Sequence, residues 1–332
     1  MSRKKQLLVI VLSVLAITSS VSHFAARALH FRLAPVSPLS FGETNLPVRA
    51  IAAGSSLTFY GINWTELSRA WGFRVQGWAV PAGSVVEMEM LQREVTSAQF
   101  TFLGVGVSDL NDNYVSDYRA DIVPFSKGIR ELREAQVDWT FARKVLAQYP
   151  LKYLRAIYPT AGRSMHVMVG VREVFRNLRG RKAAEPNDQA VLTSESNTHG
   201  ENIGSWPEAR ILRNIALTRD SAGGTFSFHG PKRDALFRFL EHGKAQGKMV
   251  VLVFPESPFY EKEFVTEKVR ADFEALLAEA QQRTPEALWV RLDRVPEFKS
   301  ADYYWDLVHL NAPGQAQATQ IVRKKLAAAG IL

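Results

Sequence analysis

The 332-residue chain is predicted to be an α/β protein, a three-layer αβα sandwich around a five-stranded parallel sheet. The first observation behind this prediction is that short apolar runs alternate with helical patterns from residue 48 to the C-terminus. Such alternation is typical of a parallel sheet with helices on both faces. The second is that 46% of the residues are hydrophobic, which is enough for a large core. The chain has no cysteine, so disulfides, thiolate zinc sites and cysteine nucleophiles are excluded.

The N-terminal segment, residues 1–24, has the pattern of a signal anchor or a signal peptide. The bases Arg3, Lys4 and Lys5 precede an apolar run over residues 7–17. We favour an uncleaved membrane helix with its N-terminus in the cytoplasm, because no clear A-x-A cleavage site follows the run. In both alternatives the body is exported. The anchor predicts a single-pass protein of a bacterial-type inner membrane, with its catalytic domain on the periplasmic side.

The remaining chain divides into a linker and one domain. Residues 25–47 contain Pro35, Pro38 and Pro47 and are predicted to be an extended linker. Residues 48–332 form the predicted domain, with a helical and loop insertion at about residues 120–242. Its expected strands cover residues 48–53, 74–78, 100–107, 248–255 and 287–292, and its clearest expected helices cover 85–95, 264–282 and 313–328. The middle of the insertion, residues 183–206, is predicted to be a long polar loop.

A small turn follows the first predicted strand, Gly54-Ser55-Ser56-Leu57. A helical pattern begins directly after it, so Ser56 is expected at a strand-to-helix turn. Backbone N–H groups at the start of a helix have no partner within the helix and can converge on one point. Ser56 is therefore either a nucleophile or a helix N-cap.

A second candidate group lies near the C-terminus, where Asp306 and His309 stand three residues apart before the last predicted helix. In a tight loop this spacing lets the carboxylate accept a hydrogen bond from the imidazole Nδ1–H. The other ring nitrogen can then take a proton from a serine. The alternative is an ordinary histidine in a loop that leads into a helix.

The two ends together resemble the SGNH hydrolase family, also called GDSL esterases or lipases. That family carries its nucleophile in a Gly-Asp-Ser-Leu turn after the first strand and its other two triad members in a late Asp-x-x-His. The resemblance implies a flavodoxin-like fold, with Ser56 as the nucleophile and Asp306 and His309 as its partners. Ser55 stands where the family has an aspartate that is not a triad member.

The resemblance also implies oxyanion donors from two further blocks. The second block corresponds to Gly77-Trp78-Ala79, so that Ala79 or Gly77 supplies a backbone N–H. The third block, Gly-x-Asn-Asp in the family, reads Gly106-Val107-Ser108-Asp109 here, which makes Ser108 the expected side-chain donor. Serine reaches less far than asparagine, and Asn111 or Asn113 could take over that role.

Other sites find no support in the sequence. The run Asp109-x-Asn111-x-Asn113 lacks the glycine and the closing glutamate of a calcium-binding loop. The histidines have no ligand spacing, so we expect no metal. No nucleotide-binding glycine motif is present, so we expect no cofactor. The net charge of +8 comes without a nucleic-acid-binding motif, so we expect no nucleic-acid partner.

The predicted function is an exported serine esterase or O-acyltransferase that acts on acyl esters of a cell-envelope or secreted polysaccharide. Tethered relatives in the superfamily, DltD-like and alginate O-acetylation-like proteins, suggest this substrate by analogy, together with a membrane acyltransferase partner. One alternative is a non-catalytic scaffold of an envelope or exopolysaccharide assembly, in which Ser56 and His309 would lie too far apart to interact. A phospholipase-like lipid esterase is the other alternative, and it requires an apolar groove beside Ser56.

Overall fold

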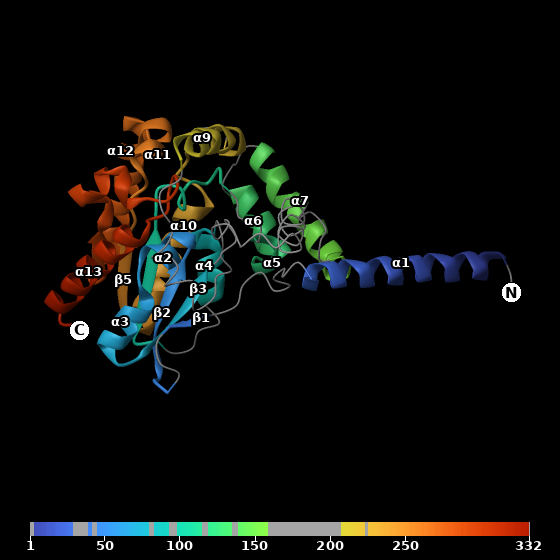
Figure 1. The fold of residues 1–332 in the computed structure, drawn as a ribbon, viewed down its shortest axis with the longest axis horizontal. Helices are drawn as coiled ribbons and strands as arrows, with labels where there is room; N and C mark the ends of the chain where they lie inside the picture. The colour runs from blue at the N-terminus through green and yellow to red at the C-terminus, as the bar shows by residue number, and fades with distance from the viewer. Residues whose placement is uncertain are drawn as a thin grey trace, which may run out of the picture.

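The protein is a layered α/β domain with one helix projecting from it (Figure 1). The computed structural model describes residues 3–28, 39–41, 45–79, 83–92, 98–114, 119–134, 139–158, 207–222 and 225–331. The predicted polar loop at residues 183–206 lies outside these ranges. The strands of the described part are β1 (Leu39–Phe41), β2 (Val48–Gly54), β3 (Arg74–Ala79), β4 (Phe100–Val105), β5 (Lys248–Val253) and β6 (Leu288–Arg291).

The six strands form one sheet in the order β1-β3-β2-β4-β5-β6. β3, β2, β4, β5 and β6 are parallel, which confirms the predicted five-stranded parallel sheet. β1 adds an antiparallel edge to β3, with Leu39 opposite Gly77. Because the chain goes from β2 out to β3 and then back across to β4, strand order reverses at β2. Crevices at such a reversal, outside the carboxyl ends of the strands, are where open α/β sheets bind ligands.

Helices cover both faces of the sheet, because side chains of each strand alternate between them. Ala50 and Ala52 of β2 face a core formed with α2 (Ser56–Gly61), α3 (Trp64–Trp71) and α13 (Ala312–Ala328). Ala53 faces the opposite core, which is formed with α4 (Val85–Gln92), α10 (Pro231–Gln246), α11 (Pro258–Phe264) and α12 (Glu267–Arg283). The sheet is therefore the middle layer of a three-layer αβα arrangement.

Between β4 and β5 the chain forms further helices, α5 (Arg119–Ile122), α6 (Phe125–Glu134), α7 (Trp139–Ile157) and α9 (Glu208–Ala222). α10 starts inside the stretch predicted to be an insertion, yet its Leu236, Phe239 and Leu240 are part of the core beneath β5. α10 is thus the crossover helix that leads from this region into β5. Three short 3₁₀ helices, Leu292–Arg294, Pro296–Lys299 and Ala301–Tyr303, connect β6 with the loop before α13.

Helix α1 (Arg3–Ala28) extends away from the body, as the dark blue ribbon in Figure 1 shows. Among the residues that the structure describes, no helix has both the length and the apolar character needed to span a bilayer. The prediction of a single-pass inner-membrane protein with a periplasmic catalytic domain is therefore wrong. The apolar run is followed by polar residues that contact the domain. Thr18 Oγ1 lies 3.0 Å from the Tyr158 hydroxyl, and Ser19 Oγ donates to the Ile157 carbonyl at 2.7 Å.

A buried ion cluster joins α4 to α6 and α10. The Glu89 side chain is only 2% exposed, and it accepts from Lys127 Nζ at 2.9 Å and from Arg238 Nε and Nη2 at 3.0 Å. Burial works to raise the pKa of Glu89, but hydrogen bonds and charges from Arg238 and Lys127 outweigh it and hold the pKa below its ordinary value of 4.5. The ionised carboxylate thus stabilises the folded state above pH 4.5, and that stabilisation is lost as the pH falls through the lowered pKa.

We predict that Glu89→Gln lowers the free energy of unfolding by about 3 kcal/mol at pH 7, because a buried charge on Lys127 loses its counter-ion. Urea denaturation measures the change. The difference from wild type should shrink as the pH falls below 4.5. The control is Glu263→Gln, which removes a surface pair with Arg219 and should change stability by about 1 kcal/mol or less. Equal losses in the two variants would contradict the role of the buried cluster.

Candidate active site

Ser56 lies where β2 ends and α2 begins. Gly54 occupies the end of the strand with φ 155°, and a Cβ at this position would lie 1.9 Å from Thr58 Oγ1 and 2.9 Å from the Gly104 carbonyl oxygen. Only glycine fits this close approach. Ser55, and not Ser56, is the N-cap of α2: its Oγ accepts from Leu57 N at 3.1 Å. The cap position is therefore filled, and the hydroxyl of Ser56 is left for another role.

The loop that carries Asp306 and His309 is closed by main-chain hydrogen bonds. Tyr304 and Leu310 form an antiparallel bridge, and Trp305 N donates to the His309 carbonyl at 3.1 Å. Asn311 then caps α13, since its Oδ1 accepts from Gly314 N at 3.1 Å. These hydrogen bonds fix the loop that positions the side chains of Asp306 and His309.

The structure brings the three predicted residues together. His309 Nε2 lies 2.8 Å from Ser56 Oγ, and His309 Nδ1 lies 2.6 Å from Asp306 Oδ2. Asp306 is buried, which would raise its pKa, but the charge and hydrogen bonds of His309 lower the pKa below its ordinary value of 3.8. Its second oxygen, Oδ1, accepts from the N–H groups of Val308 and His309 at 2.8 and 2.7 Å. An ionised Asp306 thus orients a ring whose far nitrogen faces the serine.

Two aromatic side chains flank the imidazole. The Tyr60 ring meets the His309 ring edge to face, with centroids 5.5 Å apart, and the Trp305 ring lies 5.3 Å away on a tilted plane. Tyr60 belongs to α2, which carries Ser56, and Trp305 to the loop that carries Asp306 and His309, so both segments also contribute a contact to the ring. The sequence pattern contains no signal for these two residues beyond their neighbourhood to Ser56 and His309.

The backbone N–H groups considered as oxyanion donors differ in their position in the fold. Ser56 is the first residue of α2, so its N–H lies among the groups that have no partner inside the helix. Ala79 ends β3 and pairs with Gly54, which places it at the carboxyl edge of the sheet beside the serine turn. Gly77 lies two residues earlier, in the ladder between β2 and β1, away from that edge. Residues 80–82 lie outside the described residues.

Ser108 is engaged by a glutamate that the sequence analysis did not identify. Ser108 N and Ser108 Oγ both donate to Glu256 Oε1 at 3.0 Å, so neither donor of Ser108 is left for an oxyanion while this contact persists. Glu256 follows β5 and is only 4% exposed. Burial raises its pKa to about 8, despite the hydrogen bond from Ser108 N, and the charge of Glu261 adds to the rise.

Asp109 connects the serine turn to the end of β4. Its Oδ2 accepts from Ser55 Oγ and from Gly106 N, both at 3.0 Å. Burial raises the pKa of Asp109 to about 6, although these two hydrogen bonds and the charges of Lys232 and His309 act to lower it. Ser55 therefore accepts from Leu57 N and donates to Asp109, which fixes the turn beneath Ser56 from both sides.

Asn111 and Asn113, the two residues considered as substitute oxyanion donors, make other hydrogen bonds. Asn111 Nδ2 donates to the Thr225 carbonyl at 3.1 Å, and Asn111 Oδ1 accepts from Asn113 N and Ser227 N. Asn113 Nδ2 also donates to Thr225. Both side chains fasten the segment before α10 to the loop after β4. In the described ranges, no group of three or more His, Asp or Glu side chains is arranged to hold a metal ion.

Comparison with known proteins adds little. No protein-family model and no curated protein matches the chain. Two solved structures of AqDC match, described as the structural basis for recognition and ring cleavage of the Pseudomonas quinolone signal, one of them in complex with its product. The product complex is 13% identical over 88% of this chain and 96% of AqDC, and the other structure is 11% identical over 86% and 95%; both have a TM-score of 0.25. At this TM-score the similarity carries no argument about fold or chemistry.

We predict that Glu256→Gln makes the domain relatively more stable as the pH rises. Wild-type Glu256 has a raised pKa, so its contribution to stability is complete below pH 4.5 and is lost as the pH rises through about 8. Glutamine keeps an acceptor for Ser108 and never ionises. Urea denaturation at pH 5, 7 and 9 should therefore show a stability difference that grows in favour of the variant. A difference that stays constant with pH would show that Glu256 does not titrate in this range.

Proposed function

We propose that this protein is a serine esterase or O-acyltransferase of the SGNH type, with Ser56, His309 and Asp306 as its triad. The observation that carries the proposal is the continuous chain of contacts from Asp306 Oδ2 through the imidazole to Ser56 Oγ, at 2.6 and 2.8 Å. These distances are within the range expected of a nucleophile and its base. They count against the alternative of a non-catalytic scaffold, for which a wide separation was expected.

The proposed reaction begins when Ser56 Oγ attacks the carbonyl carbon of an ester. His309 Nε2 takes the hydroxyl proton, and Asp306 holds Nδ1–H and stabilises the imidazolium that forms. The negative oxygen of the tetrahedral intermediate accepts from Ser56 N–H and Ala79 N–H. The intermediate collapses, and His309 returns the proton to the leaving alkoxide. The acyl group is now bound to Ser56 Oγ.

The acyl group on Ser56 then passes to the hydroxyl of a second molecule, the acceptor. Water gives hydrolysis, and a sugar hydroxyl gives transfer to a glycan. The triad itself acts identically in both cases, because His309 deprotonates whichever acceptor attacks. The expected substrate remains an acylated polysaccharide, on the resemblance to the SGNH superfamily alone.

The position of the triad in the fold gives independent support. Ser56 follows β2, the strand at which the order of the parallel sheet reverses, and the parallel strand order matches the flavodoxin-like arrangement. Catalytic and ligand-binding residues of such sheets lie at the carboxyl ends of the strands. Asp109 and Glu256 follow β4 and β5 at the same edge, so they support the loops around Ser56 from neighbouring strands.

We predict that Ser56→Ala abolishes hydrolysis of p-nitrophenyl acetate and that Asp306→Asn lowers kcat by about 10³- to 10⁴-fold. An amide at position 306 no longer favours the Nδ1–H tautomer that leaves Nε2 able to accept the Ser56 proton. The control is Asp302→Asn, an exposed carboxylate in the same connection between β6 and α13, which should keep wild-type kcat. Full activity of Ser56→Ala would refute the proposed nucleophile.

A second assay separates hydrolysis from transfer. The folded protein is given p-nitrophenyl acetate with and without a soluble polysaccharide, and acetate and acetylated glycan are both measured. A transferase releases nitrophenol while the acetyl group moves to the glycan, whereas an esterase releases nitrophenol and acetate into solution. Loss of either activity in Ser56→Ala ties it to the same triad.

A further inference from the structure

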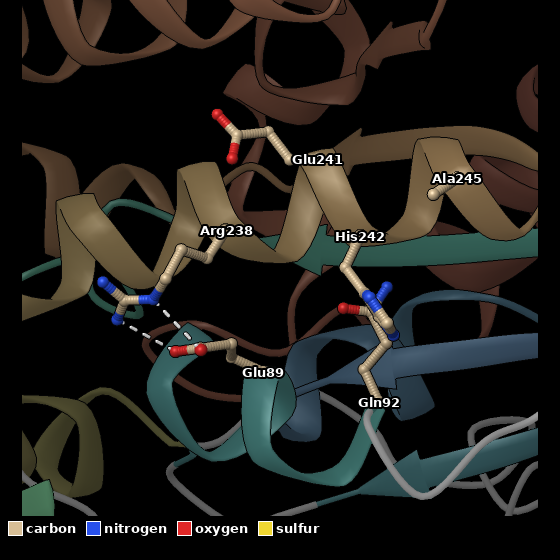
Figure 2. Close-up of a pocket in the computed structure, with 6 residues that line it drawn as sticks. All are labelled: Glu89, Gln92, Arg238, Glu241, His242 and Ala245. Atoms are coloured by element: carbon tan, nitrogen blue, oxygen red, sulfur yellow. Dashed lines mark hydrogen bonds and ion pairs between the residues drawn. The ribbon is translucent and has the colours of Figure 1, made fainter.

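The cavity between α4 and α10 is not the place where an ester meets the proposed triad. It has a volume of about 340 Å³, and Figure 2 shows the Glu89–Arg238 ion pair on its wall. No triad residue lines it. A substrate of the proposed reaction must instead be held beside His309, where the half-buried rings of Tyr60 and Trp305 lie.

The path of the proton decides which part of an ester reaches these two rings. His309 Nε2 lies 2.8 Å from Ser56 Oγ and returns its proton to the oxygen that leaves with the alcohol. The alcohol part of the ester therefore lies on the His309 side of Ser56. An acceptor hydroxyl gives its proton to the same nitrogen, so it takes the same place. Both steps bring an alcohol against the side chains that flank the imidazole.

Tyr60 and Trp305 form two walls beside the imidazole and not one stacked layer. Their ring planes are inclined at 69°, and their centroids are 6.2 Å apart. The same centroids lie 5.5 and 5.3 Å from the centroid of the His309 ring. Both side chains are half-buried, so part of each ring is accessible to a ligand.

Hydrogen bonds of the main chain hold both walls in place. Gln315 Nε2 of α13 donates to the Tyr60 carbonyl at 2.9 Å, and Trp305 N donates to the His309 carbonyl at 3.1 Å. Gln315 is buried, which shields its hydrogen bond from water. The walls are therefore formed before a substrate arrives, and this lowers the entropy cost of binding.

The chemistry of the rings favours a sugar as the alcohol. The face of an aromatic ring is electrically negative and attracts groups that carry positive charge. The C–H groups on the faces of a pyranose carry a partial positive charge, because each ring carbon is bonded to oxygen. The hydroxyls of a pyranose point outward from its rim, and a half-buried site leaves them in contact with water. A long alkyl chain has neither feature and requires an enclosed apolar groove.

We propose that Tyr60 and Trp305 bind a pyranose ring, which is the alcohol part of the ester and the acceptor in acyl transfer. This inference rests on the proposed function, because it takes His309 as the base. It goes further by assigning the class of alcohol from the contacts of the site itself.

The test uses the full chain and three acetate esters that differ only in their alcohol. They are the monoacetate of methyl glucopyranoside, cyclohexylmethyl acetate, whose ring carries no oxygen, and ethyl acetate, which has no ring. In Trp305→Ala and in Tyr60→Ala, kcat/KM for the sugar ester relative to ethyl acetate should fall about tenfold, mainly through a higher KM. The same ratio for cyclohexylmethyl acetate should change less. Trp305→Phe keeps an aromatic face and should retain most of the preference for the sugar ester.

Tyr303→Ala is the matched control. Tyr303 is half-buried in the same connection between β6 and α13, but its ring packs edge to face on Phe298, with centroids 5.7 Å apart. This variant should keep the wild-type preference among the three esters.

Two results would overturn this inference alone. If Trp305→Ala loses activity toward all three esters in proportion, the indole only supports His309. If the loss is as large for cyclohexylmethyl acetate as for the sugar ester, the rings bind an apolar alcohol and not a sugar. A wild-type protein that hydrolyses none of the esters, or a Ser56→Ala variant that hydrolyses them all, would overturn the proposed function together with this inference. The two failures can therefore be told apart.

Discussion

The parallel pairing of β2 with both β3 and β4 is the constraint on which the rest of the structure depends. It places the strand that precedes Ser56 inside the sheet, at the point where the strand order reverses. Gly54 ends this strand in a conformation that lets Thr58 and the Gly104 carbonyl approach its Cα. A side chain there would push the serine turn away from β4 and break the contacts that follow from it.

Three buried carboxyl groups then hold the loops at the carboxyl ends of the parallel strands in place. Asp306 fixes the histidine, Asp109 ties the serine turn to the end of β4, and Glu256 holds Ser108. The three differ in protonation for physical reasons. Asp306 faces a base and several N–H donors, so its pKa falls, whereas burial dominates at Asp109 and Glu256 and raises theirs. At neutral pH the site thus combines the charged Asp306 with a neighbouring carboxyl group, Glu256, that retains its proton.

Much of the fold could be predicted from the sequence, because apolar periodicity is a local property. The strand at residues 248–255 and the helix at 264–282 are close to β5 and α12 for this reason. β1 was not predicted. A strand of three residues is too short to show an alternating apolar pattern, and its pairing with β3 is decided by the tertiary fold. The membrane helix was predicted wrongly from the apolar run at residues 7–17, because the run did not show that Thr18 and Ser19 bind the domain.

In the candidate site, too, local sequence patterns predict some contacts and the tertiary fold decides the others. The Asp-x-x-His spacing is local, and it predicted the contact between Asp306 and His309. The contact of His309 with Ser56 spans 253 positions and was reached only through the family resemblance. Glu256 and Ser108 are 148 positions apart and neither carries a motif that names the other, so no sequence signal could have identified their contact. The expectation that Ser108 acts as an oxyanion donor came from its position in the chain and took no account of Glu256.

Covalent labelling tests the central claim most directly. The folded protein is treated with a fluorophosphonate, digested and examined by mass spectrometry, beside Ser56→Ala and His309→Ala. If His309 activates Ser56, the wild type carries one adduct on Ser56, His309→Ala reacts far more slowly, and Ser56→Ala carries none. A folded wild-type protein without an adduct, or with its adduct on Ser55, would contradict the account.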